Sequence, residues 1–285
     1  MASRTSPTVR RRRLAREMRQ LRSRSGKAPK EAAQYAGIAL ATLYRIENAS
    51  HAPKPADIIA LCRFYGLGEH ETDAMALLAR QGRQRGWWHK YGDVLKPGFD
   101  VYVGLEEEAS TIKSYHQEII GGLMQTPDYT RAVLRADLDV QDEDEIERTI
   151  AVRAERQRRA FAEDGHLEIW AIVQEAALRL QVGGPAVMRA QLEHLHELSR
   201  RQVFLQVLPF SAGAHPSMST GFYILGFPHP SDTDVAYIEH KTGGLYLEQV
   251  DEVSTYARVL DQLKARALGP DESRALIKDV RNEMR

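Results

Sequence analysis

Apolar residues in the first third of the chain recur with the spacing of α-helices. Between Lys30 and Asn48, two short helical patterns of this kind flank Gly37. The apolar positions are Ala32, Ala33 and Ala36 before the glycine and Ile38, Leu43 and Ile46 after it. Glycine tolerates the positive φ that a sharp corner between two helices requires. The pattern therefore predicts a hairpin of two helices, with further helices at about 9–25, 55–65 and 69–80.

The second helix of this hairpin directs a separate set of side chains outward. These are Leu40, Ala41, Thr42, Tyr44 and Arg45. In a helix-turn-helix, the second helix lies in the major groove of DNA and its outward side chains contact base edges. A helical hairpin in an ordinary protein core shows the same apolar spacing, so spacing alone leaves both interpretations open.

The distribution of charge favours the nucleic-acid interpretation. The 285 residues carry no net charge, with 39 basic and 39 acidic side chains. Residues 1–85 nevertheless sum to +10, and residues 86–285 sum to −10. Such an asymmetry indicates two modules, of which the first is suited to a polyanion such as DNA.

The pattern changes to a mixture of helices and strands in the second part of the chain. Helices are expected at about 102–120, 127–135, 142–163, 186–200, 251–267 and 271–284. Strands are expected at 167–173, 203–208, 221–227, 235–239 and 245–248. The strand, helix, strand order at 167–208 implies a parallel crossover. The glycine-containing loop before residue 245 implies an antiparallel hairpin. The fold class predicted here is α+β with a small mixed sheet.

These patterns predict three parts. Residues 1–81 form an all-α helix-turn-helix domain, residues 82–100 an aromatic linker, and residues 101–285 an α+β effector domain. The linker carries Trp87, Trp88 and Tyr91, and we expect these rings to pack against the second domain and set the orientation of the first.

The motifs resemble a known family. Residues 14–65, closing with Tyr44-Arg45-Ile46-Glu47-Asn48, are similar to the XRE-type helix-turn-helix of bacterial repressors. The remainder resembles the domain of unknown function that follows such a module in WhiJ-like regulators of actinobacteria. The segments that carry this second resemblance are 86–88, 125–130, 182–188, 207–210, 214–216 and 244–248. The resemblance implies an antitoxin-like transcriptional regulator whose effector domain binds a small protein encoded nearby.

The repressor pattern also implies particular DNA contacts. Leu40, Ala41 and Arg45 occupy positions that touch bases in such proteins, with Thr42 and Tyr44 at phosphates or a neighbouring base edge. An arginine at position 45 can donate two hydrogen bonds to guanine, and the apolar side chains can meet a thymine methyl group. Cations that position the protein on the phosphates are expected at Arg12, Arg24, Lys27, Lys30 and Lys54.

The chain departs from the repressor pattern at three places. Ala28-Pro29 stands where relatives often carry Thr-Gln, and Ala39 stands where a Ser or Thr often caps the recognition helix. Ala49 stands where most relatives carry Gly. Because fewer amide side chains remain to read bases, we expect modest sequence discrimination or recognition through DNA shape. A homodimer is expected, since single helix-turn-helix units rarely bury enough surface for specificity.

Signals for other function classes are weak. The chain lacks GxxxxGK[ST] and GxSxG motifs, so we expect no enzyme, cofactor or metal site. His194 and His196 are two residues apart on a helix and are expected to be exposed. The arginines at 153–159 share their helix with acids at 143–147 and at 155, and they are expected on a solvated helix face. With no long apolar segment and one cysteine, Cys62, the chain is expected to be cytoplasmic and not membrane-bound.

The segment from Ser211 to Thr220 is the long irregular loop of the effector domain. Long loops in compact domains are often functional, although a plain surface connection has the same appearance. His215, Pro216 and Met218 are expected to form the partner-binding contact. The alternative is a repressor whose effector domain senses a small molecule, in an apolar pocket lined by residues such as Trp170, Phe204 and Tyr223.

Overall fold

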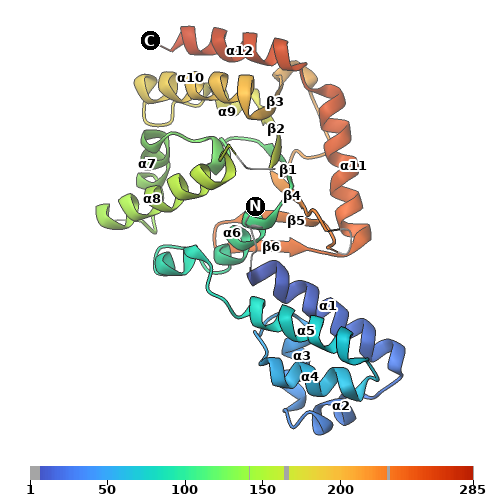
Figure 1. Ribbon diagram of the computed structural model, residues 1–285. Helices are drawn as coiled ribbons and strands as arrows, with labels where there is room; N and C mark the ends of the chain where they lie inside the picture. Colours follow the sequence, from blue (N-terminus) through green and yellow to red (C-terminus); the bar gives the residue numbers. More distant parts are fainter. Residues whose placement is uncertain (1–6, 141, 164–166, 230–231, 285) are drawn as a thin grey trace. The chain divides into compact units, whose positions relative to one another are not determined.

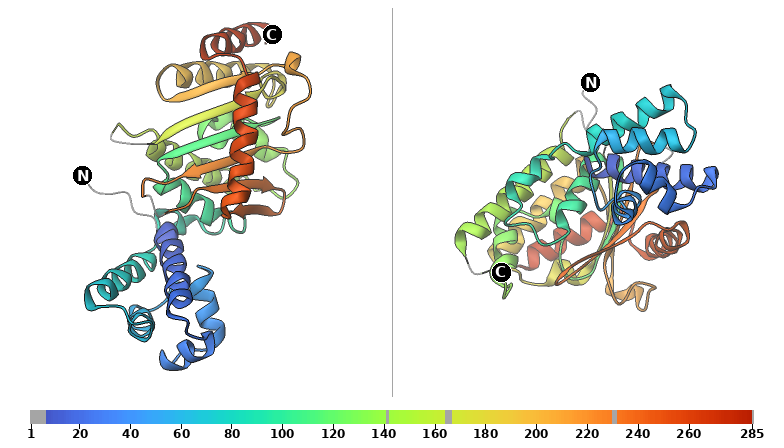
Figure 2. Two further views of the ribbon diagram at one scale, coloured as in Figure 1. Left: turned by 90° about the vertical axis from the view of Figure 1, so that its right-hand side faces the viewer. Right: turned by 90° about the horizontal axis from the view of Figure 1, so that it is seen from below.

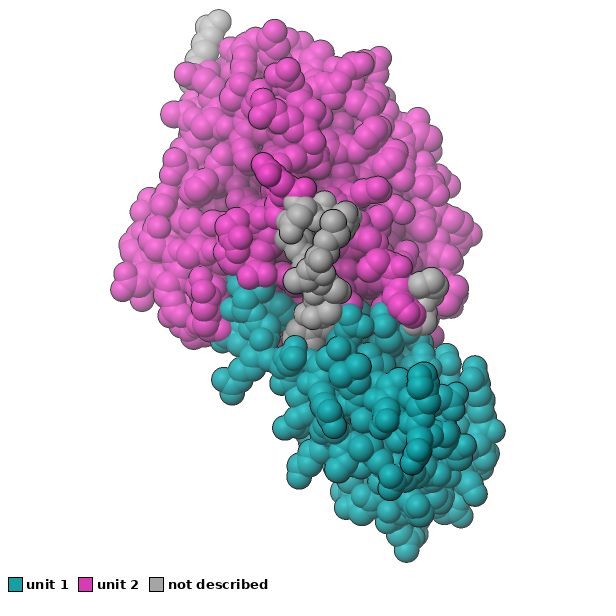
Figure 3. Space-filling view, in the orientation of Figure 1, with its two compact units in different colours: residues 1–89 teal, residues 90–285 magenta. Residues whose placement is uncertain are grey.

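The computed structural model describes residues 7–140, 142–163, 167–229 and 232–284. The chain divides into two compact units, residues 1–89 and residues 90–285 (Figure 3). The division lies inside the segment 82–100, where the 3₁₀ helix η1 (Trp87–Tyr91) carries a buried Trp88 and a half-buried Trp87. The expected role of these rings in orienting the first domain stays a prediction.

Unit 1 is all-helical (Figure 1). Its helices are α1 (Pro7–Ser25), α2 (Pro29–Tyr35), α3 (Leu40–Glu47), α4 (Pro55–Phe64) and α5 (Glu69–Gly82). Helix α5 packs against α1 and α4, and α3 packs against α1 and α2. One apolar core joins these helices; it includes Leu14, Met18, Leu43, Ile46, Ile58 and Leu61. The core is formed by the positions whose 3.6-residue spacing places them on one face of each helix.

Unit 2 is built on a six-stranded mixed sheet with the order β3-β2-β1-β4-β5-β6. Its strands are β1 (Thr111–His116), β2 (Glu168–Gln174), β3 (Val203–Leu208), β4 (Phe222–Gly226), β5 (Val235–His240) and β6 (Gly243–Leu247). Strands β1, β2 and β3 are parallel to one another, and the pairs β1–β4, β4–β5 and β5–β6 are antiparallel. The predicted α+β class, the parallel pair β2–β3 and the hairpin β5–β6 are therefore confirmed.

The helices of unit 2 follow the predicted pattern with two exceptions. They are α6 (Phe99–Glu108), α7 (Pro127–Arg135), α8 (Glu143–Ala160), α9 (Glu175–Arg179), α10 (Pro185–Arg201), α11 (Val250–Arg266) and α12 (Pro270–Glu283), with the 3₁₀ turns η2 (Gly122–Met124) and η3 (Phe210–Ala212). The short α9 was not expected. The helix expected at 102–120 is wrong, since α6 ends at Glu108 and the remainder holds β1.

The error at 102–120 has a clear physical cause. Strand β1 lies in the middle of the sheet, paired with β2 on one side and β4 on the other. Ile112 and Tyr115 are both buried although they lie on opposite faces of the strand. A strand that is covered on both faces shows no alternation of apolar and polar residues, so its apolar positions happened to match helical spacing.

The two faces of the sheet are covered differently. Helix α11 crosses one face (Figure 2) and packs Leu260 and Leu263 against Tyr115, Ile172 and other residues of that face. On the opposite face, the ring of Tyr102 from α6 contacts Tyr223 and Tyr237 of β4 and β5. Each layer supplies apolar surface to one side of the sheet, as a mixed α+β domain requires.

The free edge of β3 is protected by α12. The backbone N–H of Val207 donates to Ser273 Oγ at 2.9 Å, and the N–H of Leu268 donates to the carbonyl of Val207 at 2.9 Å. An uncovered strand edge is a template for pairing with another chain, so this contact satisfies the backbone and blocks such pairing.

Candidate nucleic-acid interface

Helix α3 presents the predicted outward residues to solvent. Leu43 and Ile46 are fully buried in the core of unit 1, whereas Leu40 is 38% exposed and Tyr44 is 45% exposed. Ala41 and Arg45 are also exposed, and Thr42 is half-buried. The five residues proposed as base contacts thus share the accessible side of one helix, because the buried residues at 43 and 46 fix its rotation.

The corner before α3 has the geometry that its glycine predicts. Gly37 has φ of 65°, the N–H of Ile38 donates to the carbonyl of Ala33 at 3.0 Å, and the N–H of Gly37 donates to Gln34 at 3.2 Å. This is a Schellman ending, in which a left-handed residue turns the chain sharply away from the helix axis. It places α3 directly after α2, as a helix-turn-helix requires.

The same ending recurs after α3 with a residue that does not favour it. Ala49 has φ of 57°, the N–H of Ser50 donates to the carbonyl of Arg45 at 3.0 Å, and Ala49 itself donates to Ile46. Among the described residues, Ala49 is the sole non-glycine with positive φ. An L-residue in this conformation brings its Cβ too close to the backbone, so the end of the recognition helix is strained.

A buried ion pair attaches α3 to α1. The guanidinium of Arg22 donates from Nε to Glu47 Oε1 at 2.7 Å and from Nη2 to Oε2 at 3.0 Å. The Glu47 side chain is 4% exposed and that of Arg22 is 24% exposed. The hydrogen bonds to Glu47 raise the pKa of Arg22 above its ordinary value. Such a two-point contact fixes the orientation of the recognition helix as well as its position.

The sequence interpretation missed this pair. It treated Glu47 as one of the acids of a basic segment, although position 47 lies four residues after the buried Leu43 and hence on the same helix face. An acid at an inward helical position was the available signal, because buried carboxylates are almost always paired.

Arg45 and Thr42 contact each other on the surface of α3. Nη2 of Arg45 donates to Thr42 Oγ1 at 3.1 Å, which holds the guanidinium along the helix. Both groups are at the surface and the hydroxyl acceptor is uncharged, so this single hydrogen bond is readily exchanged for hydrogen bonds to a base or a phosphate.

The proposed phosphate-binding cations lie in different settings. Arg24, Lys27, Lys30 and Lys54 are exposed, and Arg12 is half-buried on α1. Lys30 lies in the first turn of α2, and Lys54 immediately precedes α4. The Lys27 ammonium lies 5.3 Å from the centroid of the Phe64 ring, which itself contacts Tyr35. Neither α3 nor α4 has a side-chain cap at its N-terminus, so their first N–H groups are open to an anion.

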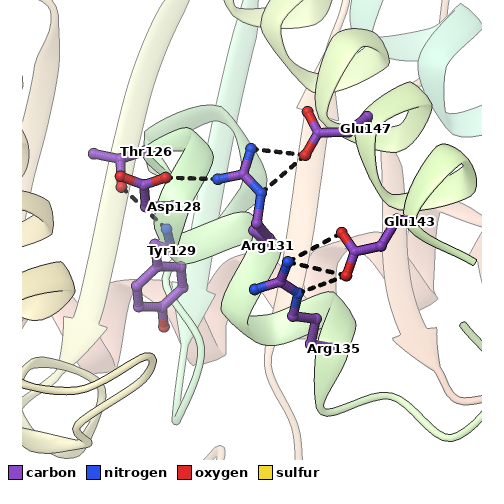
Figure 4. A network of polar contacts seen from close by, with 7 residues as sticks. All are labelled: Thr126, Asp128, Tyr129, Arg131, Arg135, Glu143 and Glu147. Atoms are coloured by element: carbon purple, nitrogen blue, oxygen red, sulfur yellow. Dashed lines mark hydrogen bonds and ion pairs between the residues drawn. The ribbon is translucent and has the colours of Figure 1, made fainter. Parts of the chain in front are cut away.

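Most of the solvent-facing arginines of α7 and α8 are paired with acids. Arg131 is bonded to Asp128 and Glu147, and Arg135 forms a two-point contact with Glu143 (Figure 4). Farther along α8, Arg158 and Arg159 share Glu155. Arg156 is buried, so the expectation that this arginine-rich stretch is uniformly solvated is wrong for it. These pairs give α7 and α8 no unopposed basic stripe for nucleic acid.

The predicted partner-binding loop is held in place by its own histidine. His215 is 9% exposed; its Nε2 lies 3.2 Å from the Tyr115 hydroxyl, and its Nδ1 accepts from the N–H of Ser217 at 3.3 Å. Burial and the charge of Arg266 lower the pKa of His215. Pro216 is exposed and Met218 is 65% exposed. The structure thus directs one of the three residues inward and two outward.

The pocket suggested for a small molecule does not form from the three residues named for it. Trp170 and Phe204 are cross-strand neighbours with ring centroids 4.1 Å apart, on the face that α11 covers. Tyr223 is on the opposite face, where it contacts Tyr102 of α6. Side chains alternate between faces along a strand, so the sheet separates the rings. His194 and His196 are half-buried, not exposed as expected.

Neither a candidate metal-binding group nor a candidate membrane-spanning helix is found among the described residues. They contain no group of three or more His, Cys, Asp or Glu side chains that could hold a metal ion. The described helices include none that is both long and apolar enough to cross a bilayer.

Comparison with known proteins identifies both units. A helix-turn-helix domain model matches residues 13–75, which include α2 and α3. The model of a domain of unknown function, DUF5753, matches residues 99–279. The curated proteins and the solved structures contain no match to the chain. The helix-turn-helix domain points to a DNA-binding regulator. Because the second match covers well over half of its length, the chain belongs to the DUF5753 family and carries a helix-turn-helix domain in front of it.

Proposed function

We propose that this protein is a sequence-specific transcriptional regulator that binds an operator as a homodimer. The observation that carries the proposal is the outward face of α3, where Leu40, Ala41, Tyr44 and Arg45 are exposed together on a helix that is rigidly attached through Glu47. Arg45 reads a guanine in the major groove, and Leu40 and Ala41 contact a thymine methyl group. Exposed cations around this helix bind the phosphates on either side.

Substituting one proposed base-contacting residue and one proposed phosphate-contacting residue tests these DNA contacts. The operator is first recovered by selecting the full-length protein on random duplex DNA. Arg45→Ala should then weaken operator binding by about 1–3 kcal/mol and relax specificity at one base pair. Lys27→Ala should weaken binding to operator and random DNA alike, and Arg80→Ala, an exposed cation on α5, serves as the control. An Arg45→Ala protein that still discriminates as the parent does would remove Arg45 from the reading face.

For unit 2 we propose an antitoxin-like role in which it binds a small protein. The support is the loop that follows β3, which is fixed to β1 by His215 and by a hydrogen bond from Gln117 Nε2 to the carbonyl of Ser217 at 3.0 Å. This anchoring presents Pro216 and Met218 to solvent on a preorganised loop. Methionine adapts to different apolar surfaces, and a preorganised loop loses little entropy on binding. The resemblance to WhiJ-like regulators supports the same role.

The partner proposal is tested with the surface residues alone. Pro216→Ser with Met218→Ser should weaken binding of a small neighbouring protein while the fold and the DNA affinity stay unchanged. Native mass spectrometry of the full-length protein from its source cell measures the partner as an added mass of several kilodaltons. His215→Gln tests the anchoring of the loop separately. Because the side chain of His215 is turned inward, a loss of binding in this variant reports a change of loop conformation and not a lost contact with the partner. Recovery of the bare homodimer, with no neighbouring small protein able to bind it on mixing, contradicts the proposal.

A further inference from the structure

A layer of buried charge lies between the sheet and helices α6 and α8 of unit 2. Its first member is a complete ion pair: Arg156 donates from Nε and Nη2 to the two oxygens of Glu106 at 2.8 and 2.7 Å. Both side chains are at most 6% exposed, and the guanidinium also lies over the rings of Phe99 and Tyr102. The positive charge of Arg156 is therefore fully compensated within the fold.

Arg153, one turn earlier on α8, has no such compensation. Its Nη1 donates to Gln125 Oε1 and to Thr130 Oγ1, and both of these acceptors are neutral. Its Nε is enclosed and has no hydrogen-bond partner among the described residues. No described carboxylate lies within ion-pair distance of its guanidinium, and burial together with Arg156 lowers the pKa of Arg153 to about 10. A buried charge without an opposite charge is costly, so folds rarely retain one unless something else compensates it.

The surroundings of Arg153 combine partial access to solvent with nearby aromatic side chains. Arg153 and Tyr223 are both half-buried, so solvent reaches part of each side chain. The Tyr223 ring lies edge-on to His116 at 5.3 Å and to Tyr102 at 5.5 Å. Tyr223 and the Arg153 guanidinium influence each other electrostatically, so these aromatic side chains lie near the guanidinium. Gly122 packs against Arg153, since a Cβ at this glycine would lie 3.5 Å from its Nε.

The local balance of charge indicates how much negative charge the site accepts. Of the two arginines in this layer, Glu106 neutralises Arg156 and leaves one positive charge. The remaining nearby acid is Glu239, which is exposed and has an electrostatic influence on Arg153 without a hydrogen bond to it. Both Glu239 and Glu106 repel any anion that approaches Arg153. A singly charged carboxylate meets about half the repulsion that a doubly charged phosphate meets, so the site favours the carboxylate.

We propose that unit 2 binds a small organic carboxylate, held by the Arg153 guanidinium with its apolar part against Tyr223. The carboxylate would accept hydrogen bonds from the nitrogens of Arg153 that the fold leaves without an anionic partner, as a guanidinium fork does for this group. This inference concerns a different face of the sheet from the loop at 211–220 and does not depend on the partner-protein proposal.

The test follows the Arg153 side chain directly in the full-length protein. The Nε–Hε signal of Arg153 is assigned in a ¹⁵N-labelled sample by its absence in Arg153→Lys, and acetate and benzoate are titrated at constant ionic strength. The signal should shift and saturate, with benzoate binding more tightly because its ring contacts Tyr223. Arg153→Lys, which keeps the charge and removes the fork, should weaken benzoate binding at least about tenfold. In both proteins this binding is followed through the backbone amide signal of Gly122, which packs against residue 153.

Two controls separate this site from the basic surface of unit 1. Arg159→Lys changes an arginine of the same helix that is paired with Glu155 and should leave benzoate binding unchanged. Inorganic phosphate should bind at unit 1 and leave the Arg153 signal in place. The proposal is overturned if neither carboxylate shifts the Arg153 signal, if phosphate shifts it and the carboxylates do not, or if Arg153→Lys folds normally and binds benzoate as the wild type does.

Discussion

Ala49 adopts a backbone conformation that its side chain disfavours. Gly37, Ala49 and Gly66 end α2, α3 and α4 with the same left-handed turn, and only the second carries a Cβ. The left-handed conformation costs an L-residue roughly 1–2 kcal/mol. A glycine at this position removes that strain, but it also makes the unfolded chain more flexible, which offsets part of the gain in stability. The strain is located directly after the helix that is proposed to read DNA.

Ala49→Gly should therefore stabilise unit 1, by about 1 kcal/mol. Denaturant unfolding followed by circular dichroism measures the change. Ala74→Gly, at an exposed position inside α5, is the matched control and should lower stability by a similar amount, because glycine weakens a helix interior. A loss of stability in Ala49→Gly would show that this turn is not strained.

His116 is a second residue whose environment has a measurable consequence. It is buried in unit 2 beside Ser114 Oγ at 2.9 Å, and burial lowers the pKa of His116 to about 4. The unfolded chain takes up this proton near pH 6.5, whereas the folded chain resists it until about pH 4. The contribution to stability is therefore fully present above pH 6.5 and is lost as the pH falls toward 4.

The free energy of unfolding of the wild-type protein should thus fall by up to about 3 kcal/mol between pH 7 and pH 4 because of His116. His116→Gln removes the titrating ring, so the difference in unfolding free energy between the two proteins should shrink as the pH falls. Denaturant unfolding at several pH values, followed by a probe of unit 2, measures this difference. A difference that is the same at pH 7 and pH 4.5 would contradict the assignment.

At the scale of the element, helix α3 depends on a contact from outside itself. It has eight residues and no side-chain cap, and a helix so short is not stable alone. Its inward apolar residues and the Arg22–Glu47 pair hold it against α1. The DNA recognition proposed for α3 would therefore depend on packing that the helix itself does not supply.

Glu47→Gln should destabilise unit 1 by about 2 kcal/mol, since it removes the charge that Arg22 is bonded to and leaves the guanidinium partly buried. Thermal unfolding of the full-length protein measures the loss. Glu31→Gln, at an exposed position, should change stability by less than about 0.5 kcal/mol. Equal effects of the two substitutions would show that the buried pair contributes nothing beyond a surface charge.

At the scale of the whole molecule, the division of charge follows the division into units. Residues 1–89 carry 17 basic and seven acidic side chains, a net charge of +10, and residues 90–285 carry −10. A polyanion is attracted by the first unit and repelled by the second. The negative charge of unit 2 also reduces nonspecific attachment to DNA through that unit.

A fragment of residues 1–89 should bind duplex DNA with an affinity that falls steeply with salt, and a fragment of residues 90–285 should not bind. Each phosphate contact contributes about 0.9 to the log–log slope, so five contacts for one subunit give a slope of about −4.5. Fluorescence anisotropy at several salt concentrations measures both fragments. DNA affinity in the fragment 90–285 would show that the charge division does not direct binding.

The sequence by itself determined the features that depend on local spacing. The hairpin of α2 and α3 and strands β2 to β6 follow from periodicity, glycine placement and short-range turn chemistry. The outward position of Leu40, Ala41, Tyr44 and Arg45 follows in the same way. The fold class and the charge division could also be predicted from the sequence, because neither requires knowledge of which distant residues are in contact. Local patterns are informative wherever a single face of an element is buried.

Tertiary structure alone decided the features that join distant residues. Strand β1 was hidden because both of its faces are buried, and only its pairing with β2 and β4 reveals it. Glu47 is paired with an arginine 25 residues away, and Arg156 with a glutamate 50 residues away. The inward His215 contacts a tyrosine 100 residues away. Whether a charged side chain is solvated or buried depends on what the fold places opposite it, and no local spacing encodes that neighbour.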